Sequence, residues 1–247
     1  MTAEGARDAE PDNGDGSGGG GGGGGDGEDH EARGLRLVPV LLGLTVVSGI
    51  IDAVSYLGLG HVFTANMTGN VVVLGFAAAG APGFSVPHTL TSLVCFLVGA
   101  VTGGRVAVRY GDGSRRTWAR VTLAAEAALV GVSAAVAFTV PDATTTAYAL
   151  IALTAFAMGL RNATVRKLGI PDLTTTVLTM TLTGLASDSR AGGGTGHHSP
   201  RRTASVLAML AGATLGAWLV VHHDLGTPLL IAAMAAGVLA VVASGRE

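Results

Sequence analysis

The sequence predicts an all-α integral membrane protein with six transmembrane helices and two short re-entrant or broken helices. Hydrophobic residues make up 49% of the 247-residue chain and charged residues only 13%, a more apolar balance than water-soluble domains have. The mean hydropathy of +0.52 points the same way. The apolar stretches are continuous and longer than the alternating strands, of about ten residues, that build outer-membrane barrels, which favours helices.

The first 34 residues differ from the rest because they are acidic and contain an unbroken glycine run at 18–25. Such a segment buries too little apolar surface to offset the entropy of ordering it, so we expect a disordered tail over 1–34. The tail lacks the basic start and short apolar core of a cleavable signal peptide, and we expect the first span to serve as an uncleaved anchor. The membrane domain then extends over 35–245.

Eight apolar segments follow the tail, and they differ in length and polarity. They lie at 37–59, 63–79, 85–104, 118–140, 147–165, 173–186, 203–221 and 225–243. A helix needs about 20 residues to cross the hydrocarbon of a bilayer, and the second and sixth segments are the shortest and the most polar. These two segments are the ones predicted to be re-entrant.

The basic residues decide the topology, since short loops rich in Lys and Arg stay on the cytoplasmic side of a membrane. Basic residues occur within 33–36, 105–120, 166–167, 190–202 and at 246, whereas the loops near Gly60, Pro82, Asp142 and His223 carry none. Eight spans starting inside would place the loop with five arginines outside. If the second and sixth segments enter and leave on one side, every basic loop lies in the cytoplasm. We therefore expect a protein of the cell (plasma) membrane with both termini cytoplasmic.

The same topology divides the chain into two similar halves, at about 35–140 and 146–243, each ordered as span, short polar segment, span, span. At an offset of 110 residues, glycine recurs at 49 and 159, alanine at 53 and 163, and threonine at 64 and 174, while Asp52 falls on Asn162. The second half starts on the opposite side of the membrane. Inverted repeats with broken helices near the midplane are typical of secondary transporters.

Charged residues inside the predicted spans are candidate functional groups. Asp52 lies in the first span, where a carboxylate costs roughly 2.5 to 3.5 kcal/mol unless it faces protein, water or a partner. It is either a proton- or cation-coupled carboxylate or substrate contact, or a structural group that holds the re-entrant loop. Glu126 and Arg161 reach comparable depths in their spans, so they are able to pair, either as a packing ion pair or as a proton relay or gate.

The two short segments carry further candidate site residues. Asn66 and Asn70 are four residues apart, as are Thr175 and Thr179, so each pair shares one helical face. Amides and hydroxyls at the start of a short helix inside a membrane form a site for an anion or a polar substrate, whereas the alternative is polar packing between helices. The predicted substrate-binding set is Asp52, Asn66, Asn70, Asn162, Thr175 and Thr179.

Two Gly-x-x-x-Gly pairs, Gly99 with Gly103 and Gly212 with Gly216, are typical of close contacts between membrane helices. They pack helices within one chain or at the seam of a homo-oligomer. The adjacent histidine pairs have no accompanying acidic or cysteine pattern, so no metal is expected. No phosphate-binding glycine motif occurs, and we expect neither a cofactor nor a nucleic-acid partner. Membrane lipid is the expected partner of the apolar helices.

Several of these residues carry a resemblance to a known family. The stretches 52–57, 65–70, 159–163 and 174–184 resemble the YoaK family of small, largely uncharacterised bacterial membrane proteins, some of them labelled predicted permeases. The most specific stretch is Ala-Asn-Met-Thr-Gly-Asn at 65–70. The resemblance covers about 35–243 and implies a multi-pass membrane fold, but it implies no substrate. The acidic tail and the segment 192–199 depart from the family, and Arg161 stands where the resemblance implies an uncharged polar residue.

Together these features predict a permease or secondary transporter for a small polar solute or ion, with its site between the two halves. The alternative is a non-transporting membrane protein that scaffolds or regulates partners through its glycine pairs and arginine loops. We expect no enzyme, because the sequence contains no Gly-x-Ser-x-Gly or His-Glu-x-x-His motif and no second aspartate placed within a span to face Asp52.

Overall fold

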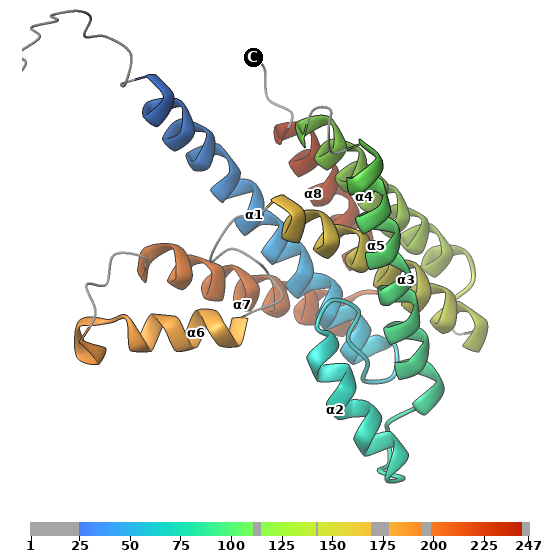
Figure 1. Cartoon of the computed structure of the whole chain (residues 1–247). Helices are drawn as coiled ribbons and strands as arrows, with labels where there is room; N and C mark the ends of the chain where they lie inside the picture. Colours follow the sequence, from blue (N-terminus) through green and yellow to red (C-terminus); the bar gives the residue numbers. More distant parts are fainter. Residues whose placement is uncertain (1–24, 111–114, 142, 169–177, 194–198, 244–247) are drawn as a thin grey trace, which may run out of the picture.

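The computed structural model describes residues 25–110, 115–141, 143–168, 178–193 and 199–243, and within these ranges the chain is helical apart from short turns (Figure 1). The helices are α1 (Gly25–Gly58), α2 (Met67–Ala78), α3 (Val86–Tyr110), α4 (Arg115–Thr139), α5 (Thr144–Leu168), α6 (Leu178–Ser187), the 3-10 helix η1 (Arg190–Gly192), α7 (Ser199–His222) and α8 (Gly226–Val242). Each apolar segment of the sequence contains one α-helix, which confirms the helical class. Most of the predicted tail lies outside the described residues, and α1 begins within it at Gly25.

Within the described ranges, five helices are long and apolar enough to cross a membrane. They run over Val38–Gly58, Val86–Tyr110, Trp118–Thr139, Thr144–Lys167 and Pro200–His222. The sixth predicted span corresponds to the apolar helix α8, which is shorter at 17 residues. The described parts of α2 and α6 have 12 and 10 residues, or about 18 and 15 Å of helix. Neither length reaches across a hydrocarbon core of about 30 Å.

The most extensive helix contacts among the described residues are those of α1 with α7 and of α3 with α5. Glycine allows the backbones to touch in both, because a Cβ atom at these positions would overlap the partner helix. The four glycines of the Gly-x-x-x-Gly pairs face the partner as follows: Gly99 faces Phe156, Gly103 faces Leu160, Gly212 faces Val46 and Gly216 faces Ile50. In return, Gly159 on α5 faces Phe96, and Gly49 on α1 faces Met209. These contacts are all made within one chain.

The two crossings correspond residue by residue. The contact residues of α1 and α5 are 110 positions apart, as Val46 and Phe156 are, and those of α3 and α7 are 113 apart, as Gly99 and Gly212 are. The burial of the side chains repeats as well, because each residue in 40–51 has the same degree of burial as the residue 110 positions later. The crossing of α1 with α7 is therefore the counterpart of the crossing of α5 with α3.

The remaining contacts follow the same correspondence. α4 packs on α5 as α8 packs on α1, and α2 packs on α3 as α6 packs on α7. α4 and α8 also pack on each other, with Gly131 facing Ala233 and Gly237 facing Ala127. Gly131 and Gly237 are 106 positions apart, as are Ala127 and Ala233, so each of these two contacts is the counterpart of the other. The described helices of the two halves thus make corresponding contacts.

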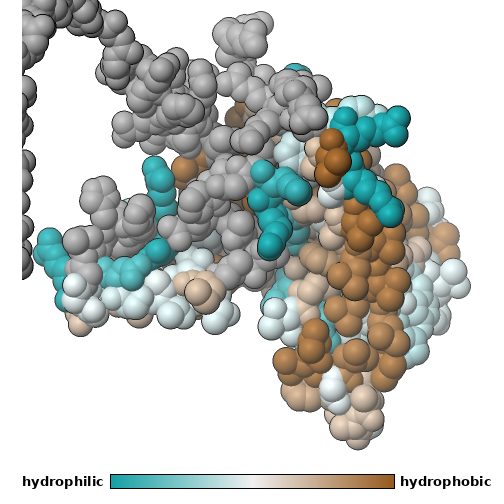
Figure 2. Space-filling model, in the orientation of Figure 1, coloured by the Kyte–Doolittle hydropathy of each residue, from teal (hydrophilic) through white to brown (hydrophobic). Residues whose placement is uncertain are grey.

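The outer faces of α3 and α7 are apolar and exposed. Figure 2 shows hydrophobic side chains along the position of α3, with hydrophilic side chains at its upper end. The exposed apolar residues of the two faces include Val94, Leu97, Val98, Val101 and Val108 on α3, and Leu207, Leu210, Leu215, Trp218 and Val221 on α7. Lipid tails solvate such faces without a free-energy cost, so the faces suit a membrane protein.

Candidate functional site

The buried carboxylate of Asp52 holds the chain that follows α1. The backbone N–H groups of Thr64 and Ala65 donate to its Oδ1 atom, at 3.1 and 2.8 Å. Asp52 lies six residues, or about 9 Å of helix, before the end of α1 at Gly58. The chain therefore turns back along α1 before α2 begins (Figure 1). The Oδ2 atom of Asp52 is buried and has no hydrogen-bond partner among the described residues.

Asn70 on α2 fixes the same turn from the other side. Its Oδ1 atom accepts from the backbone N–H of Phe63 at 2.8 Å, and its Nδ2 atom donates to the Phe63 carbonyl at 2.6 Å. Ser92 on α3 joins this arrangement, because its Oγ accepts from Asn70 at 3.0 Å and donates to the Phe63 carbonyl at 2.6 Å. Both side chains are fully buried. The amide of Asn70 is thus engaged with the protein itself.

Replacing Asp52 with alanine should loosen this turn. Thr64 and Ala65 would lose their acceptor, and a buried donor left unsatisfied costs about 1–3 kcal/mol. Asp52→Asn keeps an oxygen in the accepting position and should cost less. Hydrogen exchange of 59–66 in detergent micelles measures the effect. Asp224 is the matched control, since it accepts from the Thr227 backbone N–H at 3.0 Å at an exposed site, and Asp224→Ala should leave exchange of 59–66 unchanged.

Arg161 and Glu126 form a buried ion pair between α5 and α4, with 3.0 Å between Nη1 and Oε1. Both side chains have no exposed surface. The guanidinium also reaches α1, where Nη1 donates to the Leu44 carbonyl at 3.2 Å and Nη2 donates to the Ser48 hydroxyl. The pair therefore lies where three helices meet. Ser48 precedes Asp52 by four residues, so the pair and Asp52 lie along one face of α1.

The other residues of the predicted substrate-binding set are more scattered. Asn66 caps the start of α2 by accepting from the Gly69 N–H at 3.5 Å, and it is exposed. Asn162 is half-buried on α5 beside Arg161, Thr179 is exposed on α6, and Thr175 lies outside the described residues. The structure brings Asp52, Asn66 and Asn70 together around one turn. Whether the set binds a substrate stays a prediction.

Sequence reasoning missed Ser48 and Ser92. Ser48 had a signal, because it lies one helical turn before Asp52 in an apolar span. Ser92 had none beyond being a hydroxyl in an apolar run, since its partners are Asn70 and a backbone carbonyl 29 residues away in sequence. Across the described ranges, no three His, Cys, Asp or Glu side chains converge as a metal site.

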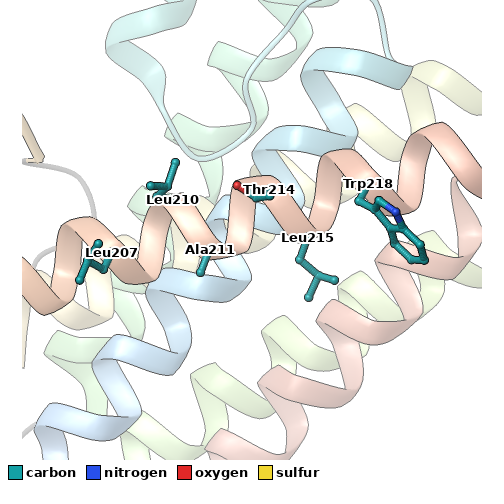
Figure 3. A pocket seen from close by; sticks show the side chains of 6 residues that line it. All are labelled: Leu207, Leu210, Ala211, Thr214, Leu215 and Trp218. Carbon is teal, nitrogen blue, oxygen red and sulfur yellow. The ribbon is translucent and has the colours of Figure 1, made fainter.

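Two surface furrows lie away from these buried groups. One runs along α7 and is lined by Leu207, Leu210, Ala211, Thr214, Leu215 and Trp218 (Figure 3). The other runs along the outer face of α3 and is lined by Val101, Gly104, Arg105, Val108 and Arg109. Each furrow is lined by a single helix, so neither lies between the two halves. Their lining is mainly apolar, as expected for surfaces in contact with lipid.

Long apolar helices, glycine crossings and fully buried charges define a multi-pass helical membrane protein. The chain belongs to the family described as "Protein of unknown function (DUF1275)", whose model matches residues 40–242. It is 38% identical over 148 residues to the UPF0700 transmembrane protein YoaK of Bacillus subtilis (strain 168). That match covers 59% of this chain and 64% of the relative, and it confirms the resemblance to the YoaK family. No solved structure matches the chain significantly.

Proposed function

We propose that the protein is a secondary transporter for a small polar solute or ion, built from two inverted repeats in the cell membrane. The observation that carries the proposal is the correspondence of the two halves, in which the main α-helix contacts of one half have counterparts in the other. In transporters built from inverted repeats, the two halves move relative to each other, and this motion opens a central site to alternate sides of the membrane. The turn held by Asp52 and Asn70, with the short α2 behind it, supplies the broken helix of such folds.

Labelling of single cysteines tests the inverted topology. In a Cys95→Ser background, we expect Pro82→Cys and Asp224→Cys to react with a membrane-impermeant maleimide from the same side of the membrane. Arg109→Cys should react only from the opposite side, because α3 crosses once between Pro82 and Arg109. Between these two positions, α3, α4, α5 and α7 make four crossings. Reaction of Pro82→Cys and Asp224→Cys from opposite sides would therefore mean that α6 also crosses the membrane, and the inverted repeat would then be wrong.

Transport itself is tested with purified protein in proteoliposomes, screened for uptake of radiolabelled small polar solutes and ions. Uptake that depends on the protein and is reduced at least tenfold by Asp52→Asn combined with Asn66→Ala would support a site at the turn after α1. Undiminished transport by this double variant would exclude that site. The outward Val108→Ala variant on α3 is the control, because its side chain is exposed on the apolar face and should not affect uptake.

A non-transporting scaffold is the second candidate, and one observation favours it. The polar groups at the centre are bonded to the protein itself, as Asp52 and Asn70 are to the backbone of Thr64 and Phe63, and both surface furrows lie on the outer faces. A transporter in a closed state has the same appearance. The two differ in accessibility: Ser48→Cys should react with a small thiol reagent from either side in a transporter, and from neither side in a static scaffold.

A further inference from the structure

The ion pair of Arg161 and Glu126 contains one hydrogen-bond donor and one acceptor that have no partner among the described residues. Only one oxygen of Glu126 bonds to the guanidinium, although a carboxylate is able to engage an arginine through two parallel hydrogen bonds. Glu126 Oε2 and Arg161 Nε are buried and have no hydrogen-bond partner among the described residues. The guanidinium therefore retains a directed donor in a site closed to water.

Packing does not require charges at this position. The correspondence between the halves relates Arg161 to Ile51, 110 positions earlier, and Glu126 to Ala232, 106 positions later. Ile51 and Ala232 are as fully buried as the ion pair is. The same helix junction is thus filled once by charged and once by apolar side chains. Buried ion pairs add little to stability compared with apolar replacements, so stability alone does not account for the charges at this junction.

We propose that Arg161 binds a small, planar, monovalent oxyanion of the carboxylate or nitrate type, and that Glu126 takes up one proton when the anion binds. This inference rests on the transporter proposed above and names its substrate class. The anion takes the place of the Glu126 carboxylate on the guanidinium, with Ser48 as a further hydroxyl nearby. The ionised pair has no net charge, and neither does the protonated glutamic acid with Arg161 and the anion. One proton therefore enters with each anion, and no net charge is placed in the membrane interior.

The other titratable groups around Glu126 are few. α5 contributes Arg161, and α1 contributes Asp52, one turn beyond Ser48. α8 has no titratable residue in Gly226–Val242. On α3, Arg105 and Arg109 are exposed, Cys95 is half-buried, and His88 packs against Tyr148 near the opposite end of α5. Glu126 is therefore the acid in direct contact with the guanidinium.

Calorimetric titration of the purified full-length protein with nitrate tests the site. We expect uptake of about one proton per nitrate near neutral pH, measured in two buffers of different ionisation enthalpy, and an affinity that falls about tenfold for each unit of rising pH. Formate should behave in the same way, whereas chloride and sulfate should bind at least tenfold more weakly because neither is planar. Nitrate binding without proton uptake, or an affinity that does not change with pH, would overturn the proposal.

Two variants identify the residues. Glu126→Gln should bind nitrate without proton uptake and with an affinity independent of pH. Glu126→Gln combined with Arg161→Gln removes both charges, leaves no lone buried ion and should abolish binding. The partly exposed pair Asp188 and Arg202, 2.5 Å apart, provides the matched control, and Asp188→Asn with Arg202→Gln should bind as the unmodified protein does. Nitrate binding that survives loss of both Glu126 and Arg161 charges would place the site elsewhere.

The proposed oxyanion site and the proposed transport function are refuted by different results. Proton-coupled nitrate binding without flux into proteoliposomes would leave the site standing and exclude transport. Flux of another solute, unaffected by the double variant at Glu126 and Arg161, would leave the transporter standing and exclude the site.

Discussion

Replacing Gly159 with alanine should strongly destabilise the protein, whereas the same change at Gly104 should leave it folded and slightly more stable. At Gly159 a Cβ would overlap the Phe96 carbonyl and lie 2.9 Å from the Ala100 nitrogen, both backbone atoms of α3. Backbone atoms have no rotamer to change, so the two helices must separate. Overpacking of this kind costs about 1–3 kcal/mol, and loss of the surrounding helix contact adds to it. At Gly104 nothing lies within 4 Å, and alanine is the better helix former by about 0.5–1 kcal/mol.

The Tm of the purified protein in detergent micelles measures both changes, which should have opposite signs. Gly49→Ala is a second case, since a Cβ at Gly49 would lie 2.6 Å from the Met209 carbonyl oxygen in the corresponding crossing of α1 and α7. The decrease in Tm should be similar to that of Gly159→Ala, since the overlap is again with backbone atoms. A Gly159→Ala protein with an unchanged Tm would mean that α3 and α5 do not approach as closely as the structure shows.

Hydropathy and charge predicted where the helices lie in the sequence far better than they predicted which helices pack against each other. The eight apolar segments all contain helices because each is defined by its own residues and the length of a bilayer. Which helices touch is a different matter, since apolar helices in lipid gain nothing from burial as such and associate through shape. The glycine pairs at 99–103 and 212–216 marked α3 and α7 as contact helices, but they did not reveal the partners Phe156 and Val46.

The sequence likewise predicted some of the buried polar contacts and not others. Comparable depth in two spans indicated that Glu126 and Arg161 are able to pair, and they lie 3.0 Å apart. The partners of Asp52 and Asn70 were out of reach of sequence, because they are backbone N–H and carbonyl groups in the turn at 63–65. Every residue has those groups. Only the path of the chain brings them to one carboxylate and one amide.

Replacing Arg161 with isoleucine should strongly destabilise the protein, and adding Glu126→Ala should recover much of the lost stability. Arg161→Ile alone leaves the Glu126 carboxylate buried without its cation, and removal of one partner of a buried pair costs about 3–5 kcal/mol. The double variant instead copies the apolar junction of Ile51 and Ala232 that the other half already uses. Without a lone charge, its Tm should lie closer to that of the unmodified protein than to that of Arg161→Ile.

The comparison isolates charge from packing, because the double variant removes more side-chain volume than the single one and should still be more stable. At the partly exposed pair of Arg202 and Asp188, Arg202→Gln should cost at most about 1 kcal/mol, since water solvates the carboxylate that is left. If the double variant at 161 and 126 is less stable than Arg161→Ile, the volume of the pair matters more than its charge. The ion pair would then be a packing element, and its apolar counterpart would no longer argue for a role in binding.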